Sequence, residues 1–124
     1  MGAEITLQWA EATLVAMRDA VRSAYPEEAC GFLLGHGELV ERVLPVANVA
    51  ADRRRGYLMA PAALLAAHRE ASARGLEVLG VFHSHPNGAA RLSARDEHLA
   101  QAGWVYAVVA TRGAEPSDLA VRRL

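Results

Sequence analysis

The spacing of hydrophobic residues predicts a first helix near the start of the chain. In residues 10–24, Leu14, Met17 and Val21 fall on one face, and charged residues fall on the other. This pattern is typical of an amphipathic helix. Pro26 should end it, because the residue before a proline is pushed out of the helical conformation.

Two further helices are predicted downstream. Pro61 is well placed at the first turn of a helix that runs to about residue 74, and Gly75 closes it. A loop containing proline and glycine then covers residues 86–92. The third helix is expected over residues 93–102.

Between the helices lie short apolar runs that are typical of strands. Residues 30–34 and 39–46 are expected to form a hairpin across a Gly-His-Gly turn, followed by an irregular polar loop at 46–56. Further strands are predicted at residues 57–59, 77–84, 104–110 and 119–124, the last of them at an edge. Strands interleaved with helices predict an α/β fold, a single layered domain over residues 1–124 with a mixed β-sheet flanked by about three helices.

The composition narrows the class of protein. The 124 residues are 52% hydrophobic, and 13 basic against 14 acidic side chains give a net charge of −1. Neither nucleic acid nor an anionic membrane surface is therefore an expected partner. No run approaches the roughly 18 apolar residues of a membrane span, and a single cysteine, Cys30, fits a reducing compartment. We expect a cytoplasmic protein, and the absence of lysine excludes lysine-based catalysis.

The densest polar cluster is the run His83-Ser84-His85-Pro86, followed by Asp96 in the third predicted helix. Alternate side chains of a strand share one face, so both imidazoles can reach one point. Two imidazoles and a carboxylate make a three-ligand zinc site with one position left open for water, as in catalytic zinc sites. Asp96 also has a structural interpretation, because it can cap the helix together with the preceding serine, and the two interpretations are compatible.

A zinc hydrolase also needs a carboxylate that takes a proton from the attacking water. Glu27 and Glu28 directly precede the apolar strand at residues 30–34. Simple exposure to solvent is the alternative interpretation of either glutamate. Period-two alternation places Glu28 on the face of Cys30 and Phe32 and turns Glu27 the other way. If that face meets the histidines, Glu28 is the base and Glu27 is solvated.

Taken together, these residues resemble the JAMM, or MPN-domain, metalloproteases. The resemblance rests on three segments: PEEACGFLLG at 26–35, HSHP at 83–86, and the serine and aspartate at 93 and 96. In element order it covers nearly the whole chain. One departure is Leu92, which stands where relatives commonly carry proline, so the loop entering the third helix should be less rigid.

The resemblance implies a role for each of these residues. His83, His85 and Asp96 would bind zinc (Zn2+), Glu28 would orient and deprotonate the water, and Ser93 would help to stabilise the oxyanion. The metal residues are intact, whereas scaffold members of the family have lost ligands. A cytidine-deaminase-like layered architecture is also expected, although deaminase activity itself needs a Pro-Cys-x-x-Cys motif that a single cysteine cannot supply.

The substrate class likewise comes from the resemblance. It implies a zinc metallopeptidase that hydrolyses a peptide or isopeptide bond at the carboxyl terminus of a ubiquitin-like or sulfur-carrier protein. The chain is too short for the large insertions of eukaryotic deubiquitinases, which favours the small prokaryotic type. The alternative is a non-catalytic MPN-like scaffold that binds partner proteins.

The remaining candidates have structural interpretations. Cys30 is expected to be a small buried hydrophobe, with contact to substrate or metal as the alternative. His36 falls in a turn, and His68 and His98 fall in predicted helices. The arginine run at residues 53–55 is expected to be a solvated loop, with an acidic patch on a protein substrate as the alternative partner.

Overall fold

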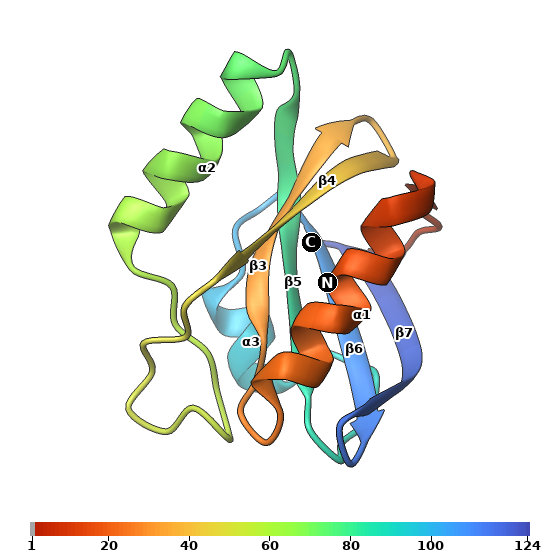
Figure 1. Cartoon of the computed structure of the whole chain (residues 1–124), viewed down its shortest axis with the longest axis vertical. Coiled ribbons are helices and arrows are strands. Elements are labelled where there is room, and N and C mark those ends of the chain that lie inside the picture. Colours follow the sequence, from red (N-terminus) through yellow and green to blue (C-terminus); the bar gives the residue numbers. More distant parts are fainter. Residues whose placement is uncertain (1) are drawn as a thin grey trace.

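The computed structural model describes residues 2–124, which form a seven-stranded sheet and three helices (Figure 1). The strands are β1 (Ala3–Glu4), β2 (Gln8–Trp9), β3 (Cys30–His36), β4 (Leu39–Val46), β5 (Glu77–His85), β6 (Val105–Arg112) and β7 (Glu115–Arg123). The helices are α1 (Glu11–Ala24), α2 (Pro61–Ala73) and α3 (Ala94–Leu99). The predicted α/β class with a mixed sheet is confirmed.

Strand β5 lies in the middle of the sheet, whose order is β1-β7-β6-β5-β3-β4-β2. It runs antiparallel to β3 on one side and parallel to β6 on the other. Near its carboxyl end, His83 pairs with Cys30 of β3 and with Val108 of β6. The backbone at this end of β5 is therefore held from both sides.

Two apolar clusters cover opposite faces of the sheet. Alternation along β3 sends Leu33 into the cluster that includes Met17 and Val21 of α1. The same alternation sends Phe32 and Leu34 into the cluster that packs against α2. Figure 1 shows α1 in front of the sheet and α3 behind it. Residues on either side of α3 pack in the α2 cluster, so α2 and α3 share one face.

Most of the predicted elements are confirmed. Helix α1 ends at residue 24, and α2 ends just before Gly75, whose φ of +66° suits the close of a helix. The hairpin of β3 and β4 is antiparallel, as expected. Strands β1 and β2 were not predicted, because each has only two residues, too few to show a hydrophobic pattern.

Three predicted elements need correction. The strand at 57–59 is wrong, because the N–H of Leu58 donates to Oδ1 of Asn48 and its carbonyl accepts from Val49, so this segment pairs with a loop. Helix α3 ends at residue 99 instead of 102, since the backbone of the next residue is extended. Strand β7 begins at residue 115, and β1 pairs with its far end, so β7 is not an edge strand along its whole length.

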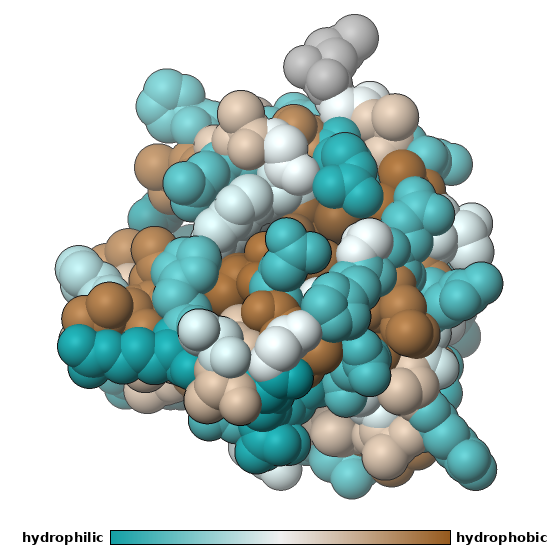
Figure 2. Space-filling model, turned by 90° about the horizontal axis from the view of Figure 1, so that it is seen from above, coloured by the Kyte–Doolittle hydropathy of each residue, from teal (hydrophilic) through white to brown (hydrophobic). Residues whose placement is uncertain are grey.

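The surface mixes apolar and polar areas. Seen from above (Figure 2), hydrophobic residues gather in the middle of the face, with polar residues around them.

None of the helices within residues 2–124 combines the length and the apolar character that a membrane span needs.

Candidate metal and catalytic site

The carboxyl end of β5 brings two histidines onto the face that α2 and α3 share. His83 and His85 alternate with Ser84, so both imidazoles project from the same side of the sheet. His83 is fully buried, and 18% of the His85 side chain is exposed. Ser84 points to the other face, where its Oγ accepts the N–H of Ala29 at 2.8 Å. This bond ties the residue that precedes β3 to β5.

Helix α3 begins with a capping box that fixes Asp96. Oγ of Ser93 accepts the N–H of Asp96 at 3.0 Å, and Oδ2 of Asp96 accepts the N–H of Ser93 at 2.9 Å. The two bonds satisfy backbone donors of the first turn and hold the carboxylate in one orientation. The predicted cap is therefore present, and the same carboxylate faces the histidines.

Three potential ligand atoms meet at one point. Nε2 of His83 and Nε2 of His85 are 3.0 Å apart, and each lies 3.2 Å from Oδ2 of Asp96. Nδ1 of His85 lies 2.9 Å from the carbonyl oxygen of Ala89, which can only accept. In the neutral imidazole that nitrogen therefore carries the proton, and Nε2 presents its lone pair to the cluster.

Burial and mutual contact shift the pKa values in this cluster. Burial lowers the pKa of His83 by more than its contact with Asp96 raises it, which favours the neutral imidazole. The hydrogen bond with Asp96 raises the pKa of His85. Burial acts to raise the pKa of Asp96, but hydrogen bonds with both histidines outweigh it and hold that pKa well below its ordinary value. The cluster therefore carries an anionic carboxylate that can balance a bound cation.

Glu28 reaches the same cluster from the segment before β3. The residue is only 6% exposed, and its Oε1 has no hydrogen-bond partner within residues 2–124. One oxygen of Glu28 and one ring nitrogen each of His83 and His85 lie within 4.8 Å of one another. Burial raises the pKa of Glu28 to about 7, although the charge of His85 acts to lower it. Such a carboxyl is suited to exchange protons near neutral pH.

Glu27 takes the opposite direction, as alternation predicts. Its carboxylate pairs with the guanidinium of Arg53 at 3.1 Å, and both side chains are substantially exposed. This residue does not line the cavity beside the histidines. Of the two adjacent glutamates, the structure brings only Glu28 to the cluster.

The loop over residues 47–58 holds the backbone of Glu28 from both sides. The N–H of Glu28 donates to the carbonyl of Arg53 at 2.7 Å, and its carbonyl accepts from Nδ2 of Asn48 at 3.1 Å. Nδ2 of Asn48 also donates to the carbonyl of Gly56 at 3.0 Å, while its Oδ1 accepts two backbone N–H groups of the loop at 3.0 and 3.1 Å. Asn48 thus organises the loop around Glu28. No sequence pattern marks this role, since an asparagine in a polar loop carries no distinguishing signal.

The same loop stacks the ring of Tyr57 on the imidazole of His83. The two ring centroids are 4.5 Å apart, and the planes meet at 26°. Burial raises the pKa of Tyr57, so the phenol stays neutral. Nδ1 of His83 is buried without a hydrogen-bond partner in the described part of the chain, and stacking is therefore the main contact that orients this ring from the loop side. Sequence reasoning missed this role and assigned Tyr57 to a strand.

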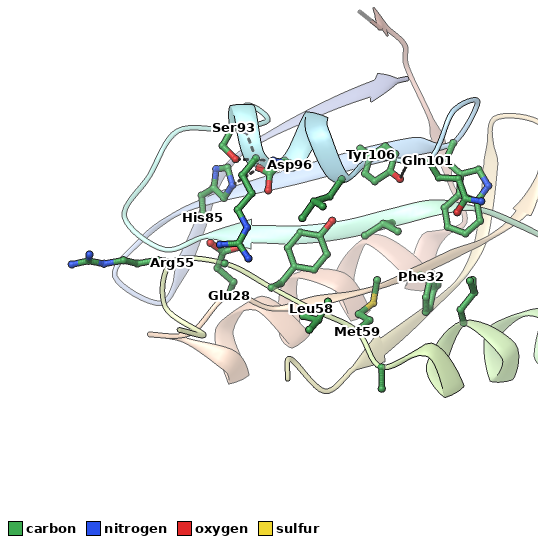
Figure 3. Close-up of a pocket in the computed structure, with 18 of the residues that line it drawn as sticks. Glu28, Phe32, Arg55, Leu58, Met59, His85, Ser93, Asp96, Gln101 and Tyr106 are labelled. Atoms are coloured by element: carbon green, nitrogen blue, oxygen red, sulfur yellow. Dashed lines mark hydrogen bonds and ion pairs between the residues drawn. The ribbon is translucent and has the colours of Figure 1, made fainter. Parts of the chain in front are cut away.

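The cluster opens into a cavity of about 810 Å³ (Figure 3). Figure 3 shows Glu28, His85, Ser93 and Asp96 gathered at one end of the cavity. The rest of its wall is mostly apolar and includes Phe32, Leu58, Met59, Leu64, Trp104 and Tyr106. The site therefore joins a polar reaction centre to a long apolar surface.

The other candidates lie outside this site. Cys30 is buried, its Sγ is 3.5 Å from the carbonyl of Val46, and burial raises its pKa to about 12. It is not among the residues that line the cavity, which agrees with the expected buried hydrophobe. His36, His68 and His98 are also absent from the cavity wall.

The fold and this site define a class of protein. Residues 10–124 match the family model described as prokaryotic homologues of the JAB domain. The chain belongs to this family, the small prokaryotic type of JAMM/MPN-domain proteins.

Two curated relatives resemble the chain over most of its length. One is a probable TtuB-protein conjugate cleaving protease of Thermus thermophilus, 40% identical over 90 residues, or 71% of this chain and 59% of the relative. The other is a desampylase of Haloferax volcanii, 31% identical over 99 residues, or 77% of this chain and 71% of the relative. The chain thus matches less than two thirds of the length of the Thermus protein.

Solved structures have the same fold. A solution structure of a protein from Desulfitobacterium hafniense is 32% identical, with a TM-score of 0.79 over 90% of this chain and 80% of that chain. A JAB1/MPN domain protein from Archaeoglobus fulgidus is 18% identical, with a TM-score of 0.56 over 91% of this chain and 94% of that chain. The second likeness shows the fold alone.

Proposed function

We propose that this protein is a zinc-dependent peptidase that hydrolyses a peptide or isopeptide bond at the carboxyl terminus of a ubiquitin-like or sulfur-carrier protein. The observation that carries the proposal is the meeting of three ligand-type atoms beside a buried glutamate whose Oε1 has no hydrogen-bond partner among residues 2–124. The names of the Thermus and Haloferax relatives, a conjugate-cleaving protease and a desampylase, support the same reaction class.

The donor set fits zinc. Around a tetrahedral zinc with bonds of about 2.0–2.1 Å, ligand atoms stand about 3.3 Å apart. The nitrogens of His83 and His85 and the oxygen of Asp96 are separated by 3.0–3.2 Å. These three residues would hold the ion, with a fourth position open toward the cavity. When bound, zinc lowers the pKa of water from 15.7 to about 7 and polarises a carbonyl group.

The chain's own side chains supply the proton transfers. Glu28 accepts a proton from the attacking water and returns it to the departing amine, and burial raises the pKa of this carboxyl in the metal-free protein, which favours proton exchange. Oγ of Ser93 already accepts the N–H of Asp96. Its own O–H is therefore available to donate to the substrate carbonyl oxygen as negative charge develops there.

The experiment compares the two adjacent glutamates. Glu28→Gln and the matched control Glu27→Gln are loaded with zinc and incubated with two probes made from TtuB, the protein in the name of the Thermus relative. One probe is extended by a single alanine, and the other is joined through its carboxyl terminus to the ε-amine of a lysine peptide. We expect Glu28→Gln to lose about 10²- to 10⁴-fold in rate, while Glu27→Gln keeps the wild-type rate.

Zinc content together with cleavage distinguishes the proposed enzyme from a non-catalytic scaffold. Both variants should retain zinc, because the proposed ligands are unchanged. Bound zinc without any Glu28-dependent cleavage of either probe would favour the non-catalytic MPN-like scaffold and contradict the proposal.

A further inference from the structure

The cavity beside the cluster has two unlike ends. One, which we call the apolar arm, is lined by Phe32, Met59, Leu64, Trp104 and Tyr106. The other, which we call the cationic end, is lined by Arg55 and Arg95. Figure 3 shows Arg55 on the far side of Glu28 and His85 from Phe32 and Met59. The reaction centre therefore lies beside the cationic end, and the apolar arm extends away from it.

Arg95 spans from α3 to the loop that holds Glu28. It directly precedes Asp96, and its Nη1 lies 3.6 Å from the position that a Cβ on Gly56 would occupy. Gly56 is the residue next to Arg55, which also lines this cavity.

Neither guanidinium is neutralised by a strong partner. Arg95 forms no salt bridge with any residue in the described range 2–124, and the one ion pair of Arg55 is with Asp52 at 3.9 Å. The side chains of that pair are 87% and 63% exposed, so the pair contributes little. Two cationic groups at one end of a cavity are thus available to an anion.

Hydrolysis separates the substrate into a carrier part and a released amine, and this inference assigns them to the two ends of the cavity. The tail of a carrier protein is an extended chain of several residues, and in this inference it lies along the apolar arm. The departing amine then leaves toward the cationic end. An α-amino acid carries its carboxylate on the carbon next to the amine, whereas the ε-amine of a lysine within a protein has no carboxylate beside it. A guanidinium group binds a carboxylate through two parallel hydrogen bonds.

We propose that Arg95, together with Arg55, binds the α-carboxylate of the residue that is released, so that the enzyme prefers a single amino acid linked in line to the carrier over an isopeptide conjugate. The inference rests on the proposed function. Water adds across the amide C–N bond, the carrier gains a terminal carboxyl group, and the amino acid leaves with its amine protonated and its carboxylate unchanged. Arg95 and Arg55 act by binding the leaving group and take no part in the proton transfers.

The test uses three TtuB probes that differ only beyond the scissile bond. The first ends in one extra alanine with a free carboxylate, the second ends in alaninamide, and the third is linked to the ε-amine of an acetyl-lysinamide. We expect wild-type kcat/KM to favour the free carboxylate over both others by about 10- to 100-fold, the range for losing hydrogen bonds to a charged group.

Variants assign this preference to the two arginines. In Arg95→Gln the kcat/KM ratio of the carboxylate probe to the amide probe should fall close to one. Arg95→Lys should keep an intermediate ratio, because lysine keeps the positive charge but cannot form two parallel hydrogen bonds. Arg55→Gln should lower the ratio less. Arg54→Gln is the matched control, since Arg54 adjoins Arg55 but does not line the cavity, and it should keep the wild-type ratio.

The outcomes separate this inference from the proposed function. Glu28-dependent cleavage of all three probes at equal rates would overturn the inference and leave the peptidase intact. A preference that survives in the double variant of Arg55 and Arg95 would overturn the assignment to these residues. The absence of Glu28-dependent cleavage of every probe would overturn both.

Discussion

The two sides of the reaction centre are built from different kinds of support. His83 and His85 project from a central strand whose backbone is paired with β3 and β6. Glu28 stands before a strand, and its backbone is held by Arg53 and by the side chain of Asn48. The two histidines are therefore positioned by sheet hydrogen bonds and Asp96 by its helix cap, while the proton-exchanging group is positioned by a loop.

This difference means that the two functions can be disturbed separately. A change on the sheet side removes a ligand atom and leaves the strand pairing in place, because that pairing uses only backbone groups. On the loop side, a change at Asn48 displaces Glu28 without replacing a proposed ligand, whereas Tyr57 of the same loop contacts His83 directly. Metal content and turnover are therefore the two measurements that distinguish the sides.

The largest effect is expected on the sheet side, from His85→Ala. This variant removes one of three proposed ligand atoms, so zinc content should fall from about one ion per chain to nearly none. Inductively coupled plasma mass spectrometry measures the content, and circular dichroism checks that the fold persists. His98→Ala, which removes a histidine outside the cavity wall, serves as the control. Equal zinc in wild type and His85→Ala would refute the ligand assignment.

A second prediction concerns the pH dependence of stability in the metal-free protein. Burial raises the pKa of Glu28 from 4.5 to about 7, so the folded state keeps a proton that the unfolded chain releases in this interval. Stability should therefore fall as pH rises from 4.5 to 7, by about 3 kcal/mol at 1.36 kcal/mol per pKa unit. Urea unfolding with a chelator, in wild type and in Glu28→Gln, measures the free energy of unfolding.

The comparison with Glu28→Gln isolates this one group, because the histidines and Asp96 titrate in both proteins. The variant should gain about 3 kcal/mol relative to wild type between pH 4.5 and pH 8. If the two stability curves run parallel across that range, the buried carboxyl of Glu28 is not the group that titrates.

The contrast between sheet and loop also explains what the sequence could predict. Alternation along a strand is a local rule, and it placed His83 and His85 on one face and separated Glu28 from Glu27. The spacing of the helix cap predicted how Asp96 is held, but its meeting with the histidines is a tertiary contact. The loop side depends on contacts between residues far apart in sequence. Asn48 bonds to the backbone of Glu28, twenty residues away, and no local pattern marks such a contact.

The strand predicted at residues 57–59 failed for the same reason. Tyr57 and Met59 alternate with Leu58 like strand residues, but the backbone of Leu58 is occupied by Asn48 and Val49. A local pattern reports an extended backbone, and only the tertiary structure decides which partner that backbone takes.

The smallest effect among the mutations of the centre is expected on the loop side, from Asn48→Ala. Without the side-chain amide, the carbonyl of Glu28 loses its partner and the loop loses four further hydrogen bonds. We expect kcat to fall about 10- to 100-fold, the usual effect of removing a group that positions a reacting residue, with zinc content unchanged. Kinetics on the TtuB probes and metal analysis of the same sample provide both values.

Asn48→Asp sharpens this prediction, because aspartate keeps the acceptor oxygen but lacks the two donors. If the bond to the carbonyl of Glu28 is the one that matters, Asn48→Asp should be as slow as Asn48→Ala; if it keeps full activity, the acceptor bonds within the loop are sufficient. Loss of zinc from Asn48→Ala to the extent seen in His85→Ala would contradict the division itself, since the loop would then support the metal cluster as well as the glutamate.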